Sequence, residues 1–442
     1  MRNKKFSFYI FTFVTAVLIL SSLSKAYNFE FGALKMQAVN TFKSPVASAG
    51  KELANVTSLN ILKESSGVIP AFKNLIGKIL GSENKASARP LRKEVFGFLP
   101  FWTLDKKIHF RYELLSTIAY FGVDINSEGE FIKERDNGKT DGAWAGWISD
   151  DFTQVINQAK KYKTKILLTI KGFDNETIEK LLNCSKCRSN LVNGALKEIK
   201  NRKADGVNLD FEYVGTPDDD LVFRFTQLVK DFVDVFHDEI PGSYVSVSTY
   251  AKSAADKKLH DIKRLSSITD SFFIMGYDFF RPVSTYAGPV APLGGAEKYG
   301  YDLKTTVADY LKLAPANKLI LGLPYYGYDW PVEKNEPNAK TLEGSDETGY
   351  ANMSSYVNSQ YDPLNDNKAR SWDSDAQVPF YSWFDKDHKV WRQAYYEDVR
   401  SLGLKYDFIK EKNLRGVGIW VLGYDGSYPE LWDLLEEKFT KP

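Results

Sequence analysis

The chain has 442 residues, of which 43% are hydrophobic and 14% aromatic, and this composition excludes a wholly disordered protein. Its 58 Lys and Arg residues nearly balance its 57 Asp and Glu residues. The chain therefore has no general positive field that would favour nucleic acid or anionic lipid. These numbers indicate a globular protein with one large core or two ordinary ones, and a ligand other than nucleic acid.

Residues 1–26 have the pattern of an export signal. Basic residues at positions 2, 4 and 5 precede an apolar run at residues 6–20, and small residues follow around Ala26. The run has about 15 residues, fewer than the roughly 20 that span a bilayer. We expect a cleaved signal peptide, with an N-terminal membrane anchor or tether as the alternative. Either one predicts a secreted or cell-envelope location.

Residues 27–91 are rich in Ala, Ser, Lys and Asn and show no sustained strand pattern. We interpret this segment as a low-complexity linker with one or two weak helices. Short β-branched and aromatic runs begin at Arg92, so a single folded domain is predicted over residues 92–442.

Short β-branched or aromatic runs alternate with helical stretches after Arg92, such as those at residues 218–236, 303–313 and 396–412. This alternation predicts βαβ units with a parallel sheet. Eight runs over about 350 residues predict an α/β fold of the (β/α)8 TIM-barrel type. The predicted strands are residues 95–102, 117–123, 165–173, 206–214, 244–250, 271–278, 319–326 and 417–422.

About 65 residues rich in Tyr, Asn, Asp and Trp, at about 331–395, separate predicted strand seven from the next helix. We expect an α+β insertion subdomain there. In a TIM barrel it would leave from the C-terminal face, where active sites lie, so it is expected to form one wall of a substrate cleft.

The two cysteines, Cys184 and Cys187, are spaced as C-x-x-C between two candidate helices. A redox motif would need a thioredoxin-like βαβ context, and a zinc site would need two more ligands. A local disulfide or a pair of free thiols is the preferred interpretation. No P-loop, dinucleotide-binding glycine run, HExxH or EF-hand loop is present, so no cofactor and no metal site is predicted.

The most informative run is residues 205–214, in which polar and apolar residues alternate. Strand geometry puts Asn208, Asp210 and Glu212 on one face, and in a barrel this face points inward. Burying two carboxylates costs several kcal/mol unless they are paired, so a purely structural role is disfavoured. Neighbouring carboxylates also raise one pKa, which an acid catalyst requires. The alternative is an exposed strand with one solvated face.

This run resembles the D-G-x-D-x-D-x-E signature on strand four of glycoside hydrolase family 18, the chitinase and N-acetylglucosaminidase family. Further segments resemble the family in the same order: M-x-Y-D at residues 275–278, G-x-P-x-Y-G at residues 322–327, and a strand-eight end carrying a Trp at residues 418–420. The resemblance covers roughly residues 94–438 and is strongest toward the bacterial spore-germination and peptidoglycan-hydrolase branch.

The resemblance implies a retaining, substrate-assisted mechanism that needs only one protein acid. Glu212 matches the general acid, which later acts as the base. Asp210 matches the residue that orients the substrate's N-acetyl group, and Tyr277 matches the hydroxyl that hydrogen-bonds the acetamide. The nucleophile is then the substrate's own acetamide oxygen.

Five further residues are candidates for substrate binding. Asp278 matches a polar contact to the sugar, and Trp420 matches the aromatic floor under the cleaved sugar. Phe98 and Trp102, at the end of predicted strand one, are additional platforms, and core packing is the alternative for each aromatic residue. Asn208 stands where many members have Asp, which removes one negative charge beside Asp210.

Two other segments matter for the substrate. Lys171 stands where the family's S-x-G-G pattern has Gly, and its simplest interpretation is a basic residue at a strand end. Residues 372–380, within the insertion, resemble the insertion segment of the same bacterial branch. This segment is expected to line the cleft, and Asn208 moves the expected substrate away from crystalline chitin.

The sequence therefore predicts a monomeric hydrolase of β-1,4 linkages in N-acetylglucosamine-containing polysaccharide, either chitin oligosaccharides or peptidoglycan. A sugar-binding lectin on the same fold is the alternative, since family members that lost the catalytic Glu keep the cleft. A third hypothesis is an envelope scaffold without glycan turnover.

Overall fold

The computed structural model of the chain describes residues 90–356, 358 and 370–440. The predicted signal segment and nearly all of the predicted linker lie outside these residues. Within the described residues, no helix has both the length and the hydrophobicity needed to cross a membrane.

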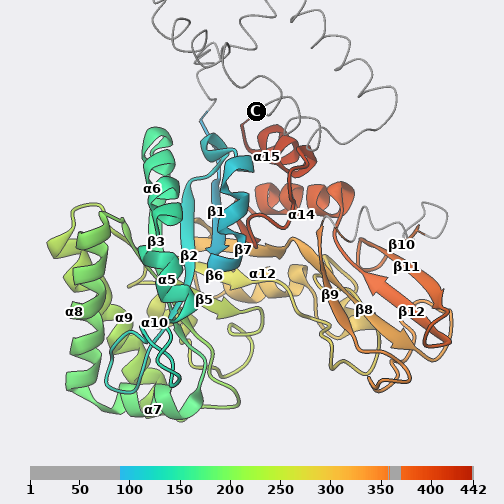
Figure 1. Ribbon diagram of the computed structural model, residues 1–442, viewed down its shortest axis with the longest axis horizontal. Helices are drawn as coiled ribbons and strands as arrows, with labels where there is room; N and C mark the ends of the chain where they lie inside the picture. Colours follow the sequence, from blue (N-terminus) through green and yellow to red (C-terminus); the bar gives the residue numbers. More distant parts are fainter. Residues whose placement is uncertain (1–89, 357, 359–369, 441–442) are drawn as a thin grey trace, which may run out of the picture. The chain divides into compact units, whose positions relative to one another are not determined.

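The core of the fold is a closed barrel of eight parallel strands, as predicted (Figure 1). Around the barrel the order is β1-β13-β7-β6-β5-β4-β3-β2, so each strand pairs with its sequence neighbour and β1 closes against β13. All eight predicted strands are confirmed. They are β1 (Glu94–Pro100), β2 (Thr117–Asp124), β3 (Lys165–Gly172), β4 (Gly206–Phe211), β5 (Tyr244–Tyr250), β6 (Ser271–Met275), β7 (Leu319–Pro324) and β13 (Gly416–Trp420).

Helices cover the outside of the barrel, and most begin at a side chain that accepts a hydrogen bond from the first turn. Asp218 caps α9 by accepting from the Leu221 N–H, and Asp398 forms a capping box with Ser401 at the start of α14. The helices are α5 (Gly142–Ile148), α6 (Asp150–Tyr162), α7 (Asn175–Asn183), α8 (Ser185–Arg202), α9 (Asp219–Glu239), α10 (Ile262–Leu265), α11 (Ala296–Tyr299), α12 (Leu303–Leu311), α14 (Val399–Glu411) and α15 (Glu430–Thr440), with 3-10 helices η1 (Phe101–His109), η2 (Tyr112–Leu114) and η3 (Ala316–Lys318).

Strand alternation divides the apolar residues between two cores. On β4, Val207, Leu209 and Phe211 point outward into the large core between strands and helices. A smaller core fills the barrel and includes Phe273, whose ring lies where a side chain on Gly322 would sit. A Cβ at Gly322 would come within 2.4 Å of that ring, so glycine is required for the close approach. The centre of the barrel is thus packed with apolar side chains.

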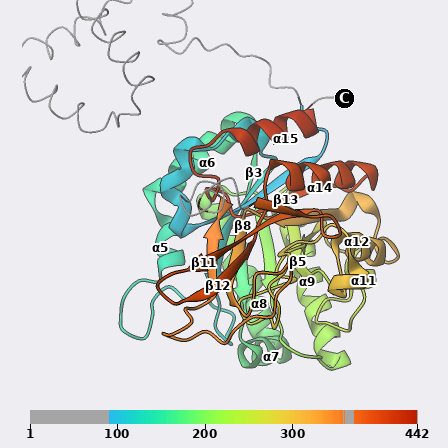
Figure 2. The same ribbon diagram turned by 90° about the vertical axis from the view of Figure 1, so that its right-hand side faces the viewer.

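The insertion forms a second sheet, antiparallel, with the order β10-β11-β12-β8-β9. It begins at Tyr326, directly after β7, rather than at about residue 331, because the aromatic run continues as a strand. Figure 2 views the molecule from the side of this sheet. Its strands are β8 (Tyr326–Val332), β9 (Asn352–Ser355), β10 (Arg370–Asp373), β11 (Val378–Asp385) and β12 (Val390–Tyr395).

The barrel loop that follows β6 contacts the insertion through its backbone. The Leu293 N–H donates to the Ala376 carbonyl at 2.9 Å, and the Ala287 N–H donates to the Ala339 carbonyl at 2.9 Å. These bonds satisfy buried backbone groups on both sides, so the insertion and the β6 loop are fixed to each other.

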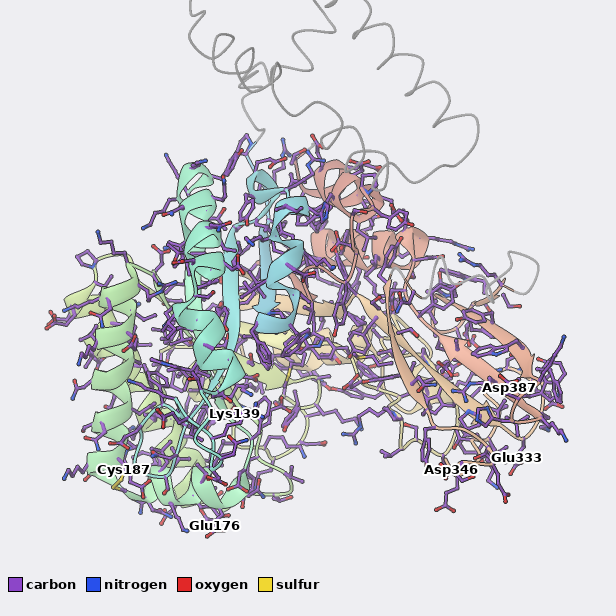
Figure 3. All side chains as sticks on the ribbon, in the orientation of Figure 1. Lys139, Glu176, Cys187, Glu333, Asp346 and Asp387 are labelled. Carbon is purple, nitrogen blue, oxygen red and sulfur yellow. A yellow bond between two sulfur atoms is a disulfide. The ribbon has the colours of Figure 1, made fainter. Side chains whose placement is uncertain are left out.

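Cys184 and Cys187 form a disulfide at the start of α8. Figure 3 labels Cys187 at this helix end. Of the two preferred interpretations, the structure therefore has the disulfide rather than free thiols.

A buried ion pair lies where α14 begins. Lys405 Nζ is 2.8 and 2.6 Å from the two carboxylate oxygens of Glu397, and the side chains are 0% and 1% exposed. The Ser401 hydroxyl also donates to Glu397. Both charges are desolvated, so each depends on the other.

We expect Lys405→Met to lower the free energy of unfolding by about 3–5 kcal/mol, because Glu397 is left buried without its counter-ion. Urea denaturation followed by tryptophan fluorescence measures the loss. Lys410→Met, on the exposed face of the same helix, is the control and should change stability little. A loss for Lys405→Met no larger than that of the control would contradict the assignment.

Candidate active site

A cavity of about 670 Å³ opens at the carboxyl ends of the barrel strands. Residues that end β1, β2, β4, β5, β6 and β13 line it. This is the face on which TIM-barrel enzymes carry their active sites. Of the predicted site residues, the cavity wall contains Glu212, Asp210, Tyr277, Asp278, Trp420 and Phe98.

The predicted strands are too long at this end. β4 stops at Phe211 and β6 at Met275, so Glu212, Tyr277 and Asp278 follow the strands. Strand pairing stops where the chains diverge into loops, which sequence alternation does not reveal. Glu212 still keeps the register of the strand, because its N–H donates to the Gly172 carbonyl at 2.8 Å.

Asp210 is the most deeply buried acid of the cavity, with 3% exposure. Its Oδ1 atom is buried and has no hydrogen-bond partner among the described residues. Burial raises the pKa of Asp210 well above its usual value, and the nearby charge of Glu212 raises it further, while a hydrogen bond with Ser248 opposes the shift. The site therefore holds a carboxyl group that binds a proton readily and has one free acceptor atom.

Burial also raises the pKa of Glu212. The negative charge of Asp278 adds to this shift, whereas a hydrogen bond with Tyr250 and the positive charge of Arg281 oppose it. A carboxyl group in this environment keeps its proton to a higher pH than a free glutamic acid. That property suits a group that must donate a proton near neutral pH.

Asp278 links the barrel to the insertion. The hydroxyls of Tyr326 and Tyr328, both on β8, donate to its Oδ1 atom. Asp278 has a φ of 59°, in the left-handed region that Asp tolerates better than most residues. The first insertion strand therefore helps to position a carboxylate of the cavity.

Aromatic side chains surround Trp420 at the end of β13. Its ring stacks with Tyr277 at 6.2 Å between centroids and an interplanar angle of 23°, and it meets Phe121 edge-on at 4.5 Å. Phe98 meets Trp420 at 5.4 Å and is 1% exposed. Phe98 therefore packs mainly in the barrel core, whereas Trp420 presents a face to the cavity.

Trp102 and Asn208 are not among the residues that line the cavity. Trp102 lies in η1, beyond the end of β1, where it is 46% exposed and contacts Phe121 at 6.3 Å between centroids. The chain turns at Pro100, so the strand predicted to reach Trp102 ends earlier. Asn208 lies deeper in the barrel and is fully buried.

Asn208 forms a polar layer with two serines of β5. Its Nδ2 donates to Ser246 Oγ at 2.9 Å, and Ser248 Oγ donates to its Oδ1 at 3.1 Å. Because Ser248 also hydrogen-bonds Asp210, Asn208 acts on the cavity through that serine.

Lys171 lies beside Asp210 in the strand register. Its Nζ is 3.1 Å from Asp124 Oδ1, and it also lies over the rings of Phe121 and Phe173. Its positive charge lowers the pKa of Asp210, although less than burial raises it. The interpretation as a basic residue at a strand end holds, and Asp124 is its counter-ion.

The structure adds residues that the sequence did not single out. Tyr250 and Ser248 come from β5, Phe121 from β2, and Lys252 and Arg281 from the loops after β5 and β6. Their only sequence signal was a position near the end of a predicted strand, which is shared by many residues that do not line the cavity.

A sequence profile described as Glycosyl hydrolases family 18 matches residues 94–425, more than half of the chain. The chain belongs to this family. The match covers every strand of the barrel and all of the cavity residues named above. The resemblance drawn from the strand-four run is therefore confirmed at the level of the family.

Proteins similar to this chain include bacterial and animal ones. The Cortical fragment-lytic enzyme of Bacillus subtilis (strain 168) is 26% identical over 309 residues, which cover 66% of this chain and 64% of that protein. The Di-N-acetylchitobiase of Homo sapiens is 26% identical over 338 residues, with 67% and 82% covered. The chain spans only 59% and 64% of the lengths of two Bacillus subtilis relatives.

Solved structures share the fold. The spore cortex-lytic enzyme SleL of Bacillus megaterium QM B1551 superposes with a TM-score of 0.61 at 22% identity, over 78% of this chain and 74% of that chain. The Group IV chitinase of Ostrinia furnacalis, in complex with allosamidin, gives 0.65 at 20% identity, over 78% and 97%. The TIM barrel with an insertion is thus confirmed as the fold.

We expect Asp278→Asn to lower the pKa of Glu212, because it removes a negative charge that disfavours ionisation of that carboxyl. Carboxyl chemical shifts followed by NMR against pH measure the change. Asp151→Asn, on the surface of α6, is the control and should leave the Glu212 titration in place. An unchanged or higher midpoint in Asp278→Asn would show that Asp278 does not act on Glu212.

Proposed function

We propose that this family 18 member is a glycosidase that cleaves β-1,4 linkages of N-acetylglucosamine-containing glycans. One observation carries the proposal: the free, buried Oδ1 atom of Asp210 lies in a cavity that also holds the Glu212 carboxyl and the face of Trp420. An acetamide N–H would satisfy that acceptor, and a sugar ring would cover the indole. Family membership supports the same reaction class.

In the proposed mechanism the substrate's acetamide supplies the nucleophile. Glu212 donates its proton to the glycosidic oxygen, and the bond between this oxygen and C1 breaks. The acetamide oxygen bonds to C1, which forms an oxazolinium ion, while Asp210 accepts a hydrogen bond from the acetamide N–H. Water then attacks C1 and gives a proton to the Glu212 carboxylate. Two displacements at C1 leave the anomeric configuration retained.

Tyr277 and Asp278, which lie beside the two carboxyls, are suited to bind the substrate in this mechanism. Tyr277 is held against Trp420 by stacking, and its hydroxyl can donate to the acetamide oxygen. Burial keeps the pKa of Tyr277 well above its usual value, so the hydroxyl stays a donor throughout the neutral range. Asp278, fixed by Tyr326 and Tyr328, can contact a sugar hydroxyl.

The substrate is proposed to be peptidoglycan or chitin oligosaccharide. Named relatives include a cortical fragment-lytic enzyme and di-N-acetylchitobiases. We further propose a monomer that acts outside the cytoplasm, in the cell envelope or secreted. The signal-like residues 1–26 and the disulfide between Cys184 and Cys187 support this location.

Glu212→Gln should reduce kcat about 10²–10⁴-fold, because the amide keeps the shape of the side chain and cannot donate the proton. Mass spectrometry of products from chitooligosaccharides and from purified peptidoglycan measures turnover. Glu176→Gln, exposed on α7, is the matched control. Wild-type rates in Glu212→Gln would refute the assigned acid. Binding without turnover in the unmodified protein would favour the lectin.

Asp210→Asn should also lower kcat strongly, because an amide cannot stabilise the positive charge that develops on the oxazolinium ion. NMR of the first products measures the anomer released, which is β when the configuration is retained. An unchanged rate, or the α-anomer as the first product, would rule out substrate assistance.

A further inference from the structure

Two cations without ion partners line the catalytic cavity. Arg281 follows β6 and Lys252 follows β5, and both side chains are exposed at the cavity wall. Among the described residues, neither side chain forms an ion pair or a hydrogen bond. The other lysine near the cavity, Lys171, is paired with Asp124. The charge of Arg281 also lowers the pKa of Glu212 and of Asp278, but no step of the proposed mechanism uses a hydrogen bond from either cation.

The main chain of Arg281 is anchored on both sides. Its N–H donates to Ser284 Oγ at 2.8 Å, and its carbonyl accepts from Trp330 Nε1 at 3.0 Å. Trp330 is fully buried in the insertion sheet. The guanidinium is therefore carried by a fixed backbone, which lowers the entropy lost when it binds a ligand.

Lys252 is positioned by an aromatic ring. Its Nζ lies 4.8 Å from the centroid of Tyr301, whose hydroxyl donates to Asp309 at 2.9 Å. A cation held over a ring face by this attraction keeps its hydrogen-bond donors available on the other side. Tyr301 also lines the cavity.

Barrel topology sets the strands before these cations opposite β1 and β2. In the closed order of eight strands, β5 is four places from β1 and β6 is four places from β2. The strands that lead to Lys252 and Arg281 thus lie opposite the strands that carry Phe98 and Phe121, and Glu212 follows β4, next to β5. A glycan that lays one sugar over Trp420 and extends past Glu212 on the other side would meet both cations.

We propose that Arg281 and Lys252 bind a carboxylate carried by the glycan on the β5–β6 side of Glu212. This inference rests on the proposed glycosidase function and narrows its substrate to acid-bearing glycans. In alternating N-acetylglucosamine and N-acetylmuramic acid strands, the carboxylate comes either from the lactyl group or from an attached peptide. A guanidinium matches a carboxylate with two parallel hydrogen bonds, and the lysine adds a second donor.

The substrate series separates the sources of charge. It contains neutral chitooligosaccharides, peptide-free strands with a free lactyl carboxylate, the same strands with that carboxylate converted to a methylamide, and strands that keep their stem peptides. The full chain, Arg281→Gln, Lys252→Gln and the double variant are compared by kcat/KM. Lys197→Gln, exposed on α8, is the matched control.

We expect the unmodified chain to prefer an acidic strand over its methylamide, and Arg281→Gln to reduce that preference about tenfold or more. A higher kcat/KM on the peptide-free strand than on its methylamide identifies the lactyl carboxylate as the bound group. A higher kcat/KM on the stem-peptide strand alone identifies a carboxylate of the peptide. Equal rates on acidic and methylamide strands, with no preference for the stem-peptide strand, would overturn the proposal. Equal losses on all substrates in Arg281→Gln would also overturn it, because they indicate an effect on Glu212 rather than on substrate charge.

A binding measurement distinguishes failure of the carboxylate site from failure of the proposed glycosidase function. If the unmodified chain releases no product from any substrate, the proposed glycosidase function fails, and titration calorimetry with the same four glycans decides the inference. Tighter binding of an acidic strand that Arg281→Gln abolishes supports the carboxylate site. Equal binding of acidic and neutral glycans overturns it.

Discussion

The structure around the cavity depends on the burial of the Asp210 carboxyl group inside the barrel. A carboxyl group at this depth loses most of its hydration, which costs several kcal/mol when it is charged. Ser248 supplies a hydrogen bond and Lys171 supplies a positive charge, yet the Oδ1 atom has no partner within the described residues. This open acceptor is the atom that the proposed mechanism pairs with the acetamide N–H of the substrate.

Apolar side chains fill the barrel interior near the Asp210 carboxyl group. Phe273 fills the barrel centre against Gly322, where a side chain could not fit, and Phe96 and Phe98 complete the interior. Asn208, Ser246 and Ser248 of β4 and β5 form a hydrogen-bonded group beside these rings. The larger cavity opens at the carboxyl ends of the strands, and Asp210 and Glu212 lie together there.

The insertion supports the cavity from outside and does not form the expected wall, since none of the cavity-lining residues lies on its described strands. Through Tyr326 and Tyr328 it fixes Asp278, and through Trp330 it holds the main chain of Arg281. A change in this sheet would therefore move Asp278, whose charge raises the pKa of Glu212. It would also move Arg281 in the proposed carboxylate site. The same barrel could adapt to different glycans by changes in the insertion, while Asp210 and Glu212 stay in place.

The sequence by itself determined the local features. Strand alternation was sufficient for the eight barrel strands and for the inward face that carries Asp210, because both depend on a period of two residues and on the parallel order of strands. Tyr277 and Trp420 came instead from the resemblance to family motifs, and they lie with Asp210 at one cavity.

Only the tertiary structure decided which loop residues line the cavity. Trp102 was expected at the cavity and lies in η1, whereas Lys252 and Arg281 reach the cavity wall without a motif to mark them. Their positions depend on barrel closure, which brings β5 and β6 opposite β1 and β2, and on contacts with the insertion. Such contacts join residues far apart in sequence, so no local pattern of the chain encodes them.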